Sequence, residues 1–507
     1  MASAFKTYTH EHGGRVMLLF LLFLLAIYSF ITSGFNVFAI ICIIPLMIAF
    51  IYAAFKWKHL LFWCLIIVNY NLQFFGKNQW LPGGIPMSAY NEFFEIALIA
   101  VALIDIRKEQ LFGRAINIMS FSILLWTLLC LLEVFNNTCG LGMNVEGWFT
   151  AFRLIAFQLF YYVIIFSLYI DSPQVLRKYL WVWACLALFS AFWTFKQQYI
   201  GLTSAEYAWL YYGGPSKHLV NGIVRYWSTF SDAANYGCNA GATSVAFILF
   251  GLTSKFTKER IFFIIVGLAV LWGMFASGTR TAIACFLAGL MVYVFLSKSV
   301  KMAVPIIILG LTSFFFLAFT NIGQGNNQIR RMRSVFSKAD ASANVRDINK
   351  ATIGKYLKDA PWGIGIGVGN GDVPARNKYV VLSYTAPDSE YVFMWIHTGI
   401  IGLIVFSFSM ILMFIGACRI VLFRLKSKSL IGIGAGLCSA FVAIQLGAYA
   451  NQVLYQYPNG LIFFGGLAIV YVLPYLEKDW IIYEQDKLAK QEEKKRLKLE
   501  KKLASRA

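Results

Sequence analysis

The sequence predicts an all-α polytopic membrane protein of about fourteen transmembrane helices with one large external loop. Of its 507 residues, 59% are hydrophobic and 13% are charged, which is too apolar for a soluble protein of this length. The apolar residues form continuous runs long enough to cross a bilayer, unlike the alternating segments of about ten residues that build membrane β-barrels. The connections between the runs alternate in charge, as loops on opposite sides of a membrane do.

Each apolar run is interpreted as one span. The first run follows Arg15 and has no small-residue cleavage site behind it, so we expect an uncleaved helix and not a signal peptide. The fourth run is short and either tilts into the interface or extends past its charged flanks. The predicted spans are residues 16–32, 35–54, 59–75, 92–104, 115–135, 152–170, 178–200, 233–251, 261–277, 280–297, 301–319, 389–416, 430–450 and 459–476.

The charge of the connections predicts the topology. Short and mostly basic connections are expected in the cytoplasm, and an even number of spans then places both termini there. The predicted organisation is eleven spans in 1–319, a large periplasmic loop at 320–388, three spans in 389–476 and a charged cytoplasmic tail helix at 477–507. The short connections are residues 55–59, 105–114, 171–178, 254–260, 297–301 and 419–428, and the opposite ones are 76–91, 136–151, 201–232, 320–388 and 451–458.

Composition argues against several classes of function. None of the nine cysteines forms a C-x-x-C pair and the five histidines lack H-E-x-x-H spacing, so neither a disulfide framework nor a zinc site is indicated. The net charge of +20 is spread over loop ends, which suits an anionic membrane surface and not a nucleic acid. We therefore expect no metal, no cofactor and no nucleic-acid partner.

The long loop carries an excess of positive charge where membrane proteins usually avoid it. Such a loop is expected to hold an anionic ligand such as a phosphate or pyrophosphate. Arg346 and Lys350 lie four residues apart on a helix expected at 344–358, so they share a face. Residues 320–387 contain ten basic residues (Arg330, Arg331, Arg333, Lys338, Arg346, Lys350, Lys355, Lys358, Arg376, Lys378) and four acids (Asp340, Asp347, Asp359, Asp372), for 10 − 4 = +6.

A second set of polar residues is expected at the same membrane boundary. Arg280 lies in a tight connection between two spans, where a guanidinium either binds an anion or anchors the helix end at the interface. Arg225 and Asn235 add a cation and an amide at the same depth. Ser231 or Asp232 could cap the helix that follows.

The segment Pro361–Gly371 has a glycine at every second position from 363 to 371. The spacing is not G-x-G-x-x-G and no strand–helix unit surrounds it, which argues against a nucleotide fold. The glycines either let the backbone present N–H groups to a ligand or form a flexible turn.

Two carboxylates, Asp388 and Glu390, precede the twelfth span. They could supply a general base, bind a metal, or cap a helix N-terminus. Outside this pair no D-x-D pattern is found on the external side, so a metal-dependent mechanism would rest on these two residues alone.

Four segments together resemble the O-antigen ligase/polymerase family of membrane glycosyltransferases. The resemblance extends over about residues 225–420, and Asp388 stands where the family commonly has a histidine. It implies transfer of a glycan from undecaprenyl pyrophosphate to a sugar hydroxyl, with inversion and without metal. The segments are Phe230–Gly237, Ser277–Ala282, Asn344–Arg346 with Pro361–Gly367, and Asp388–Ser389 followed by Gly399–Gly402.

The resemblance also implies roles for individual residues. Arg280 and Arg346 would hold the pyrophosphate, and Asp388 would accept the proton, with Glu390 as its rival. The full set of predicted substrate-binding residues is Arg225, Asn235, Arg280, Arg346, Lys350, Ser389 and Tyr391.

Three functions remain open from the sequence. A polymerase that joins lipid-carried repeat units is favoured over a ligase, which would transfer the glycan to another lipid or a protein, because Asp388 replaces the residue typical of ligases. A flippase or transporter is the alternative from another class, but the span interiors read as nearly free of charge. The predicted partners are the carrier-linked glycan, an acceptor glycan or lipid, the bacterial inner membrane and other polysaccharide assembly proteins.

Overall fold

A computed structural model describes isolated positions between 17 and 59 and then residues 60–504, except 82–84, 106–110, 214–217, 221–222, 298–299, 326–328, 331–332, 334–340 and 370. The chain divides into two compact units, Met1–Cys64 and Leu65–Ala507. The account below concerns the second unit. The first two predicted spans, 16–32 and 35–54, lie outside the described residues apart from a few positions.

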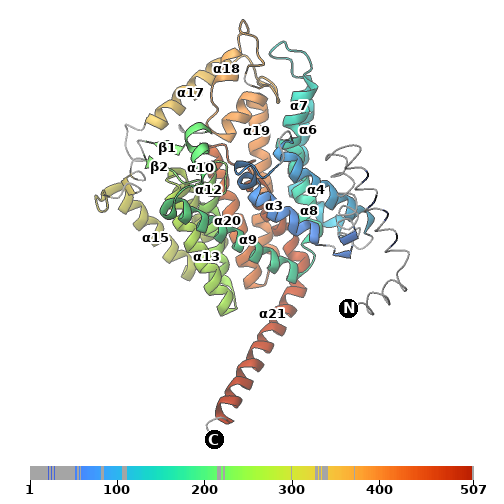
Figure 1. The fold of residues 1–507 in the computed structure, drawn as a ribbon, viewed down its shortest axis with the longest axis vertical. Coiled ribbons are helices and arrows are strands. Elements are labelled where there is room, and N and C mark those ends of the chain that lie inside the picture. Colours follow the sequence, from blue (N-terminus) through green and yellow to red (C-terminus); the bar gives the residue numbers. More distant parts are fainter. Residues whose placement is uncertain are drawn as a thin grey trace. The chain divides into compact units, whose positions relative to one another are not determined.

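The second unit is almost entirely helical (Figure 1). Among the described residues ten helices are long and apolar enough to cross a membrane. They are α3 (Leu60–Lys77), α4 (Met87–Ile104), α6 with η2 (Ile118–Phe135), α7 to α8 (Val145–Tyr169), α9 with η4 (Pro173–Ile200), α12 (Ala233–Thr253), α13 (Thr257–Ala276), α19 with η7 (Glu390–Arg424), α20 (Lys428–Ala450) and Gly460–Glu493 of η8 and α21. The prediction of a polytopic helical protein is confirmed, whereas the count of fourteen spans is not.

The remaining elements are not among these ten candidates. Two of them, α14 (Arg280–Leu296) and α15 (Val300–Phe319), coincide with the tenth and eleventh predicted spans. The others are η1 (Phe112–Ala115), η3 (Arg153–Phe157), α10 (Ser204–Ala208), η5 (Trp209–Gly213), the antiparallel strands β1 (Leu219–Val220) and β2 (Ile223–Val224), α17 (Ala341–Leu357) and α18 (Val380–Tyr384). The last helix, α21, runs from Gly465 to Ala504.

The fourth span differs from its prediction because α4 begins at Met87, five residues before the expected start. Glu92 and Glu95, which stand at the start of the predicted span, therefore lie beyond the first turn of the observed helix. Glu95 is fully buried and accepts hydrogen bonds from Asn91 Nδ2 at 2.6 Å and from Gln158 Nε2 at 3.0 Å. Glu95 is thus an exception to the expectation that the span interiors are nearly free of charge.

Helix α12 is the central helix of the second unit. It packs against α9, α13, α14 and α20. Its many small residues let these neighbours approach closely, as is usual where lipid gives no hydrophobic drive for helix association. Helix α12 is consequently held in a fixed place among these four helices.

Ion pairs gather at one end of the second unit. Lys487 Nζ lies 2.7 Å from Glu259 Oε1, and Lys255 Nζ lies 2.6 Å from Glu484 Oε2. These contacts bring the connection 254–260 onto α21, which then runs away from the other helices (Figure 1). The connection 254–260 therefore lies at the same end of the second unit as the base of this tail.

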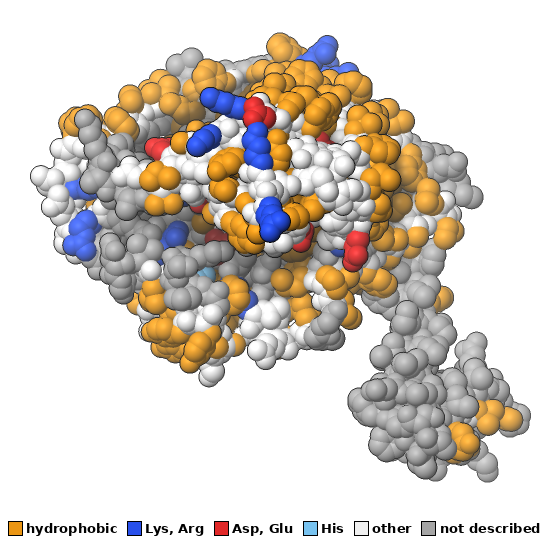
Figure 2. All heavy atoms as spheres, turned by 90° about the horizontal axis from the view of Figure 1, so that it is seen from above, with side chains coloured by type: hydrophobic (Ala, Val, Ile, Leu, Met, Phe, Trp, Pro, Cys, Tyr) orange, Lys and Arg blue, Asp and Glu red, His pale blue; other side chains and the backbone are white. Residues whose placement is uncertain are grey.

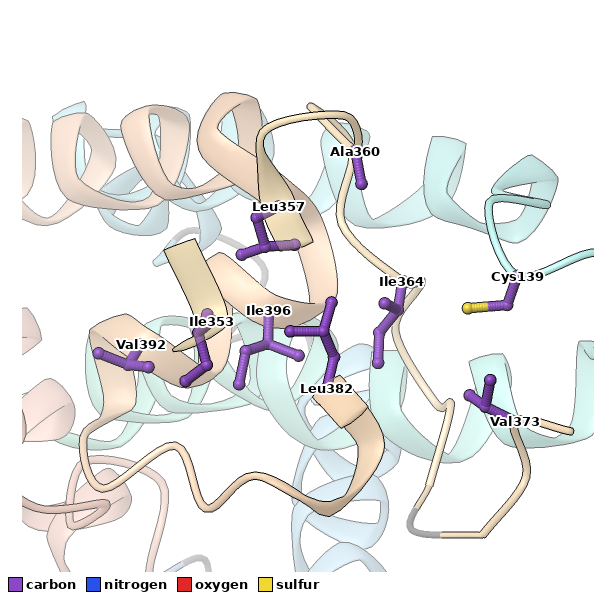
Figure 3. Packing of buried hydrophobic residues seen from close by; sticks show 9 residues of the cluster. All are labelled: Cys139, Ile353, Leu357, Ala360, Ile364, Val373, Leu382, Val392 and Ile396. Carbon is purple, nitrogen blue, oxygen red and sulfur yellow. The ribbon is translucent and has the colours of Figure 1, made fainter. Parts of the chain in front are cut away.

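The opposite end carries α17 and α18, which fold onto the N-terminal part of α19 (Figure 1). Helix α17 coincides with the helix expected at 344–358. A buried apolar cluster, here called the loop core, holds these segments together (Figure 3). The loop core consists of Cys139, Ile353, Leu357, Ala360, Ile364, Val373, Leu382, Val392 and Ile396.

The glycine-rich segment packs against a break in α19. At Gly399 the backbone is non-helical, with φ of 64°, so the preceding carbonyls lose their helical partners. The N–H groups of Ile364 and Gly365 donate to the carbonyls of Ile396 and His397, each at 2.9 Å. Farther along, a Cβ on Gly367 would lie 2.1 Å from the carbonyl oxygen of Gly147 in α7. Gly363 and Gly367 therefore serve close backbone packing, whereas Gly365 and Gly371 have room for a side chain but adopt positive φ angles.

Replacing Gly399 by alanine is expected to destabilise the protein by about 2–4 kcal/mol. A side chain is strained at positive φ, and the added Cβ would lie 2.0 Å from the Pro361 carbonyl oxygen. Thermal unfolding of the purified protein measures the effect. The control is Gly310→Ala in α15, where no atom lies within 4 Å of the added Cβ and stability should stay the same or rise slightly. Equal melting temperatures for both variants would contradict this account of the break.

Candidate active site

Arg225 binds the turn between α13 and α14, which ends at a second predicted arginine, Arg280. Arg225 Nη2 donates to Thr279 Oγ1 at 2.9 Å, and Thr279 directly precedes Arg280, the first residue of α14. Thr279 Oγ1 also donates to the Ala233 carbonyl at 2.6 Å, which fixes the turn to the start of α12. We call Arg225 and Ser277–Arg280 the arginine corner. Both guanidinium-bearing side chains are half-buried.

The start of α12 is organised by structural hydrogen bonds. Asp232 is the N-cap, and its Oδ1 accepts from the N–H groups of Ala234 and Asn235 at 2.8 and 2.9 Å. Asn235 is fully buried, with Nδ2 donating to Ser231 Oγ at 2.8 Å and Oδ1 accepting from Asn459 Nδ2 at 2.6 Å. Its amide is thus occupied by protein groups, so Asn235 supports the site and does not face a ligand.

The segment Asp388–Tyr391, here called the carboxylate turn, begins α19. Asp388 adopts a left-handed conformation with φ of 52°, which is uncommon outside glycine. The Ser389 N–H donates to the Pro387 carbonyl at 2.5 Å and closes a three-residue turn around it. Asp388 is half-buried, and its Oδ2 accepts from Asn349 Nδ2 of α17 at 2.7 Å. Among the described residues Oδ1 receives no hydrogen bond.

The other residues of the carboxylate turn have separate partners. Ser389 is the N-cap of α19, with Oγ accepting from the Val392 N–H at 3.1 Å, so neither acid plays that role. Glu390 is buried and accepts from the Leu454 N–H at 3.2 Å. The Tyr391 hydroxyl donates to Gln445 Oε1 at 3.0 Å. Asp388 and Glu390 do not converge on one point, and the described residues contain no group of three acidic, histidine or cysteine side chains able to hold a metal.

Helix α17 carries two predicted cations beside this turn. Lys350 Nζ lies 4.9 Å from the centre of the Tyr449 ring, a cation–π contact at the end of α20. Arg346, one turn earlier, is half-buried and makes no hydrogen bond or ion pair with the described residues. By contrast, Arg333 Nη2 donates to the Ile322 carbonyl at 2.6 Å and Lys378 pairs with Asp359, so part of the loop charge has a structural use.

The arginine corner and the carboxylate turn are joined through the connection 451–459. Leu454 binds Glu390, and the Tyr457 carbonyl accepts from Asn235 Nδ2 at 3.2 Å. Seen from the end that carries α17, the surface shows several separate lysine and arginine side chains (Figure 2). The structure therefore gathers most predicted residues at one end of the second unit. It adds two that the sequence did not reveal, Asn349 and Thr279, because their roles depend on partners distant in the chain.

Burial and positive charge act together next to Arg225. His218 is fully buried, its Nε2 accepts from Trp209 Nε1 at 3.3 Å, and its carbonyl accepts from the Arg225 N–H at 2.8 Å. Burial first, and the charges of Lys77 and Arg225 second, lower the pKa of His218 to about 4. The imidazole therefore stays neutral beside the arginine corner.

The stability of the protein should fall in mild acid because of His218. Its pKa of about 4 in the fold lies below the ordinary value of about 6.5, so the unfolded chain binds the proton more tightly. Above pH 6.5 His218 makes its full contribution to the free energy of unfolding. As the pH falls toward 4 the free energy of unfolding decreases by up to about 3 kcal/mol, and it levels off at lower pH. Thermal unfolding at pH 7 and pH 4.5 measures it, and His218→Gln should remove most of the difference. An equal acid-induced loss in both proteins would contradict the assignment to His218.

The family comparison agrees with this geometry. Residues 263–407 match the family model described as O-Antigen ligase. The match includes the turn before Arg280, all of α17, the glycine-rich segment, the carboxylate turn and the break at Gly399, whereas Phe230–Gly237 lies outside it. No curated protein matches the chain in sequence. The family implies a glycosyltransferase-type membrane enzyme with a lipid-linked glycan donor and a polysaccharide acceptor. The resemblance predicted from the sequence is confirmed over residues 263–407, where this multi-pass membrane protein is similar to the family described as O-Antigen ligase.

Proposed function

We propose that the protein transfers a glycan from an undecaprenyl-pyrophosphate carrier to a sugar hydroxyl at the periplasmic face of the bacterial inner membrane, as a polysaccharide polymerase. One observation carries the proposal: cationic side chains and an unusual carboxylate turn are gathered at the same end of a membrane-spanning helical unit. A lipid diphosphate presents its charge at the membrane surface while its tail stays among the helices, so both parts of the carrier have a suitable environment.

The cations would bind the leaving group. In this mechanism Arg280 and Arg346 hold the diphosphate, with Arg225 and Lys350 adding positive charge. Guanidinium groups match phosphate oxygens in pairs and stabilise the negative charge that grows as the glycosidic bond breaks. Such a mechanism needs no metal ion, because the side chains provide the electrostatic stabilisation.

Asp388 would be the general base. Its half-buried Oδ1 is open to accept a proton, while Asn349 fixes the other oxygen. The acceptor hydroxyl oxygen attacks the anomeric carbon, its proton passes to Asp388, and the bond from that carbon to the diphosphate oxygen breaks with inversion. Glu390 is a poorer base, because it is buried and bound to the Leu454 N–H. Ser389 and Tyr391 would support this turn through their hydrogen bonds to α19 and Gln445.

Replacing Asp388 by asparagine should lower turnover at least about a hundredfold while carrier binding changes little. The amide keeps the shape of the side chain but cannot accept the proton. Single-turnover transfer and binding of the lipid-linked substrate are measured on the same preparation. If binding is lost but each bound carrier is still transferred at the normal rate, Asp388 is not the base.

Incubation of the purified protein with lipid-linked repeat units alone tests the reaction. A ladder of chain lengths is expected of a polymerase, whereas a strict requirement for a second lipid or protein acceptor would identify a ligase, the activity named by the family description. Arg280→Ala should abolish the product while the protein still accumulates in the membrane. Arg260→Ala is the matched control, since Arg260 lies in the connection grouped with the C-terminal tail and binds the Ser254 carbonyl. Product formation by Arg280→Ala at the normal rate would remove this residue from the site.

A further inference from the structure

A large cavity lies beside the carboxylate turn. Its volume is about 780 Å³, within the range of small-molecule sites. Its walls come from α7 and η3, from the loop at 367–372, from the segment 382–387 and from the first turns of α19. Pro387, which lines the cavity, directly precedes Asp388, so a ligand inside it would lie close to the proposed base.

The chemistry of this cavity differs from that of the arginine corner. The described residues that line it include two carboxylates, Glu146 and Asp372, but no lysine or arginine. A diphosphate would be repelled there. Thr150, Ser383 and Thr385 also line the cavity, and their hydroxyl oxygens, which donate to carbonyls of their own helices, can still accept hydrogen bonds. Phe393 adds an apolar ring to the lining. This mixture of hydrogen-bonding groups and apolar surface suits a neutral, polyhydroxylated ligand.

His397 gives the cavity one acceptor with a fixed direction. Its Nδ1 lies 3.0 Å from the Gly365 carbonyl oxygen, and because a carbonyl can only accept, Nδ1 must carry the proton. In the neutral imidazole, Nε2 is then the acceptor. The Gly365 N–H in turn donates to the His397 backbone carbonyl at 2.9 Å, and the Phe393 ring lies against the imidazole, tilted by 47° with 4.3 Å between centroids. Gly365 and Phe393 therefore restrict the orientation of the ring.

We propose that this cavity binds the acceptor sugar as a neutral oligosaccharide, and that Nε2 of His397 accepts a hydrogen bond from one of its hydroxyls. The assignment to the acceptor rests on the proposed function. The donor glycan carries the diphosphate next to its reactive carbon, which places that end with the cations. The acceptor contributes only a hydroxyl, and the cation-free cavity next to Asp388 suits it.

Two substitutions separate sugar binding from folding. In His397→Asn the amide Nδ2 can still donate to the Gly365 carbonyl, so the packing of the glycine-rich segment is kept while the Nε2 acceptor is lost. Thr150→Trp fills the cavity from α7. Thr312→Trp is its matched control, because Thr312 is also exposed and also donates to the carbonyl four residues earlier, but lies on α15 and does not line the cavity.

The probe is the phosphate-free oligosaccharide released by mild acid from the lipid-linked glycans of the producing cell. Calorimetric titration into the full-length protein in lipid nanodiscs should show binding that is weakened about tenfold or more by His397→Asn and by Thr150→Trp, and is unchanged by Thr312→Trp. Inorganic pyrophosphate, titrated separately, should bind the wild type and His397→Asn equally. Unchanged melting temperatures would show that the variants are folded.

Three results have different meanings. Equal oligosaccharide affinity in the wild type, His397→Asn and Thr150→Trp would overturn the sugar site and leave the proposed transferase function intact. No binding to the wild type at millimolar concentration would also overturn it. Loss of sugar binding in both variants supports the site. If in that case the wild-type protein forms no transfer product from the lipid-linked substrate, the proposed function is wrong although the sugar site is supported.

Discussion

The arrangement of the candidate site depends on the pairing between the broken helix α19 and the glycine-rich segment. An unpaired carbonyl in an apolar environment costs several kcal/mol, so α19 can bend at Gly399 only where other N–H groups replace the helical ones. Ile364 and Gly365 supply them. The loop is thus tied to a membrane helix by backbone bonds that neither partner can satisfy alone. His397 lies two residues before the break and takes its position directly from this pairing, whereas Asp388 lies at the start of the same helix and is held by Asn349.

Around this framework the charges are separated. Positive groups lie at the arginine corner and on α17, whereas the cavity next to the carboxylate turn is lined by Glu146 and Asp372. A glycosyl transfer from a lipid diphosphate has the same division, because the leaving group is strongly anionic and the attacking group is a neutral hydroxyl. The connection 451–459 contacts the carboxylate turn through Leu454 and the start of α12 through Tyr457. In the proposed mechanism this separation of charge directs the anionic diphosphate and the neutral hydroxyl to different places, and no metal ion is needed to do so.

Much of the fold could be predicted because long apolar runs leave few alternatives to membrane helices. Helix α4 begins earlier than predicted because the polar residues before Glu92 do not look like part of a span, and the partners of Glu92 and Glu95, Arg153 and Gln158, are distant in the chain. The sequence alone could not decide why glycines recur in the segment 361–371, because the residue that packs against Gly363 is Gly399, more than thirty residues later in the chain. For the candidate site, the sequence showed which residue types are present but not which hydrogen-bond partners surround them. Asn235 reads as a surface amide, yet it is saturated by Ser231 and Asn459, and nothing in the sequence around His397 indicates that Gly365 fixes its tautomer.

The C-terminal helix has a mechanical consequence. Its base is clamped by Glu259 and Lys255, and beyond Lys487 it continues as one helix to Ala504, away from its neighbours (Figure 1). At 1.5 Å per residue this projecting part is a stiff arm of about 25 Å. A small tilt of α21 at its ion pairs with Glu259 and Lys255 displaces the end of the arm in proportion to its length. Small rearrangements of the helices near the ion pairs would therefore appear as a larger change in the distance between a label at the end of the arm and a label elsewhere on the helices.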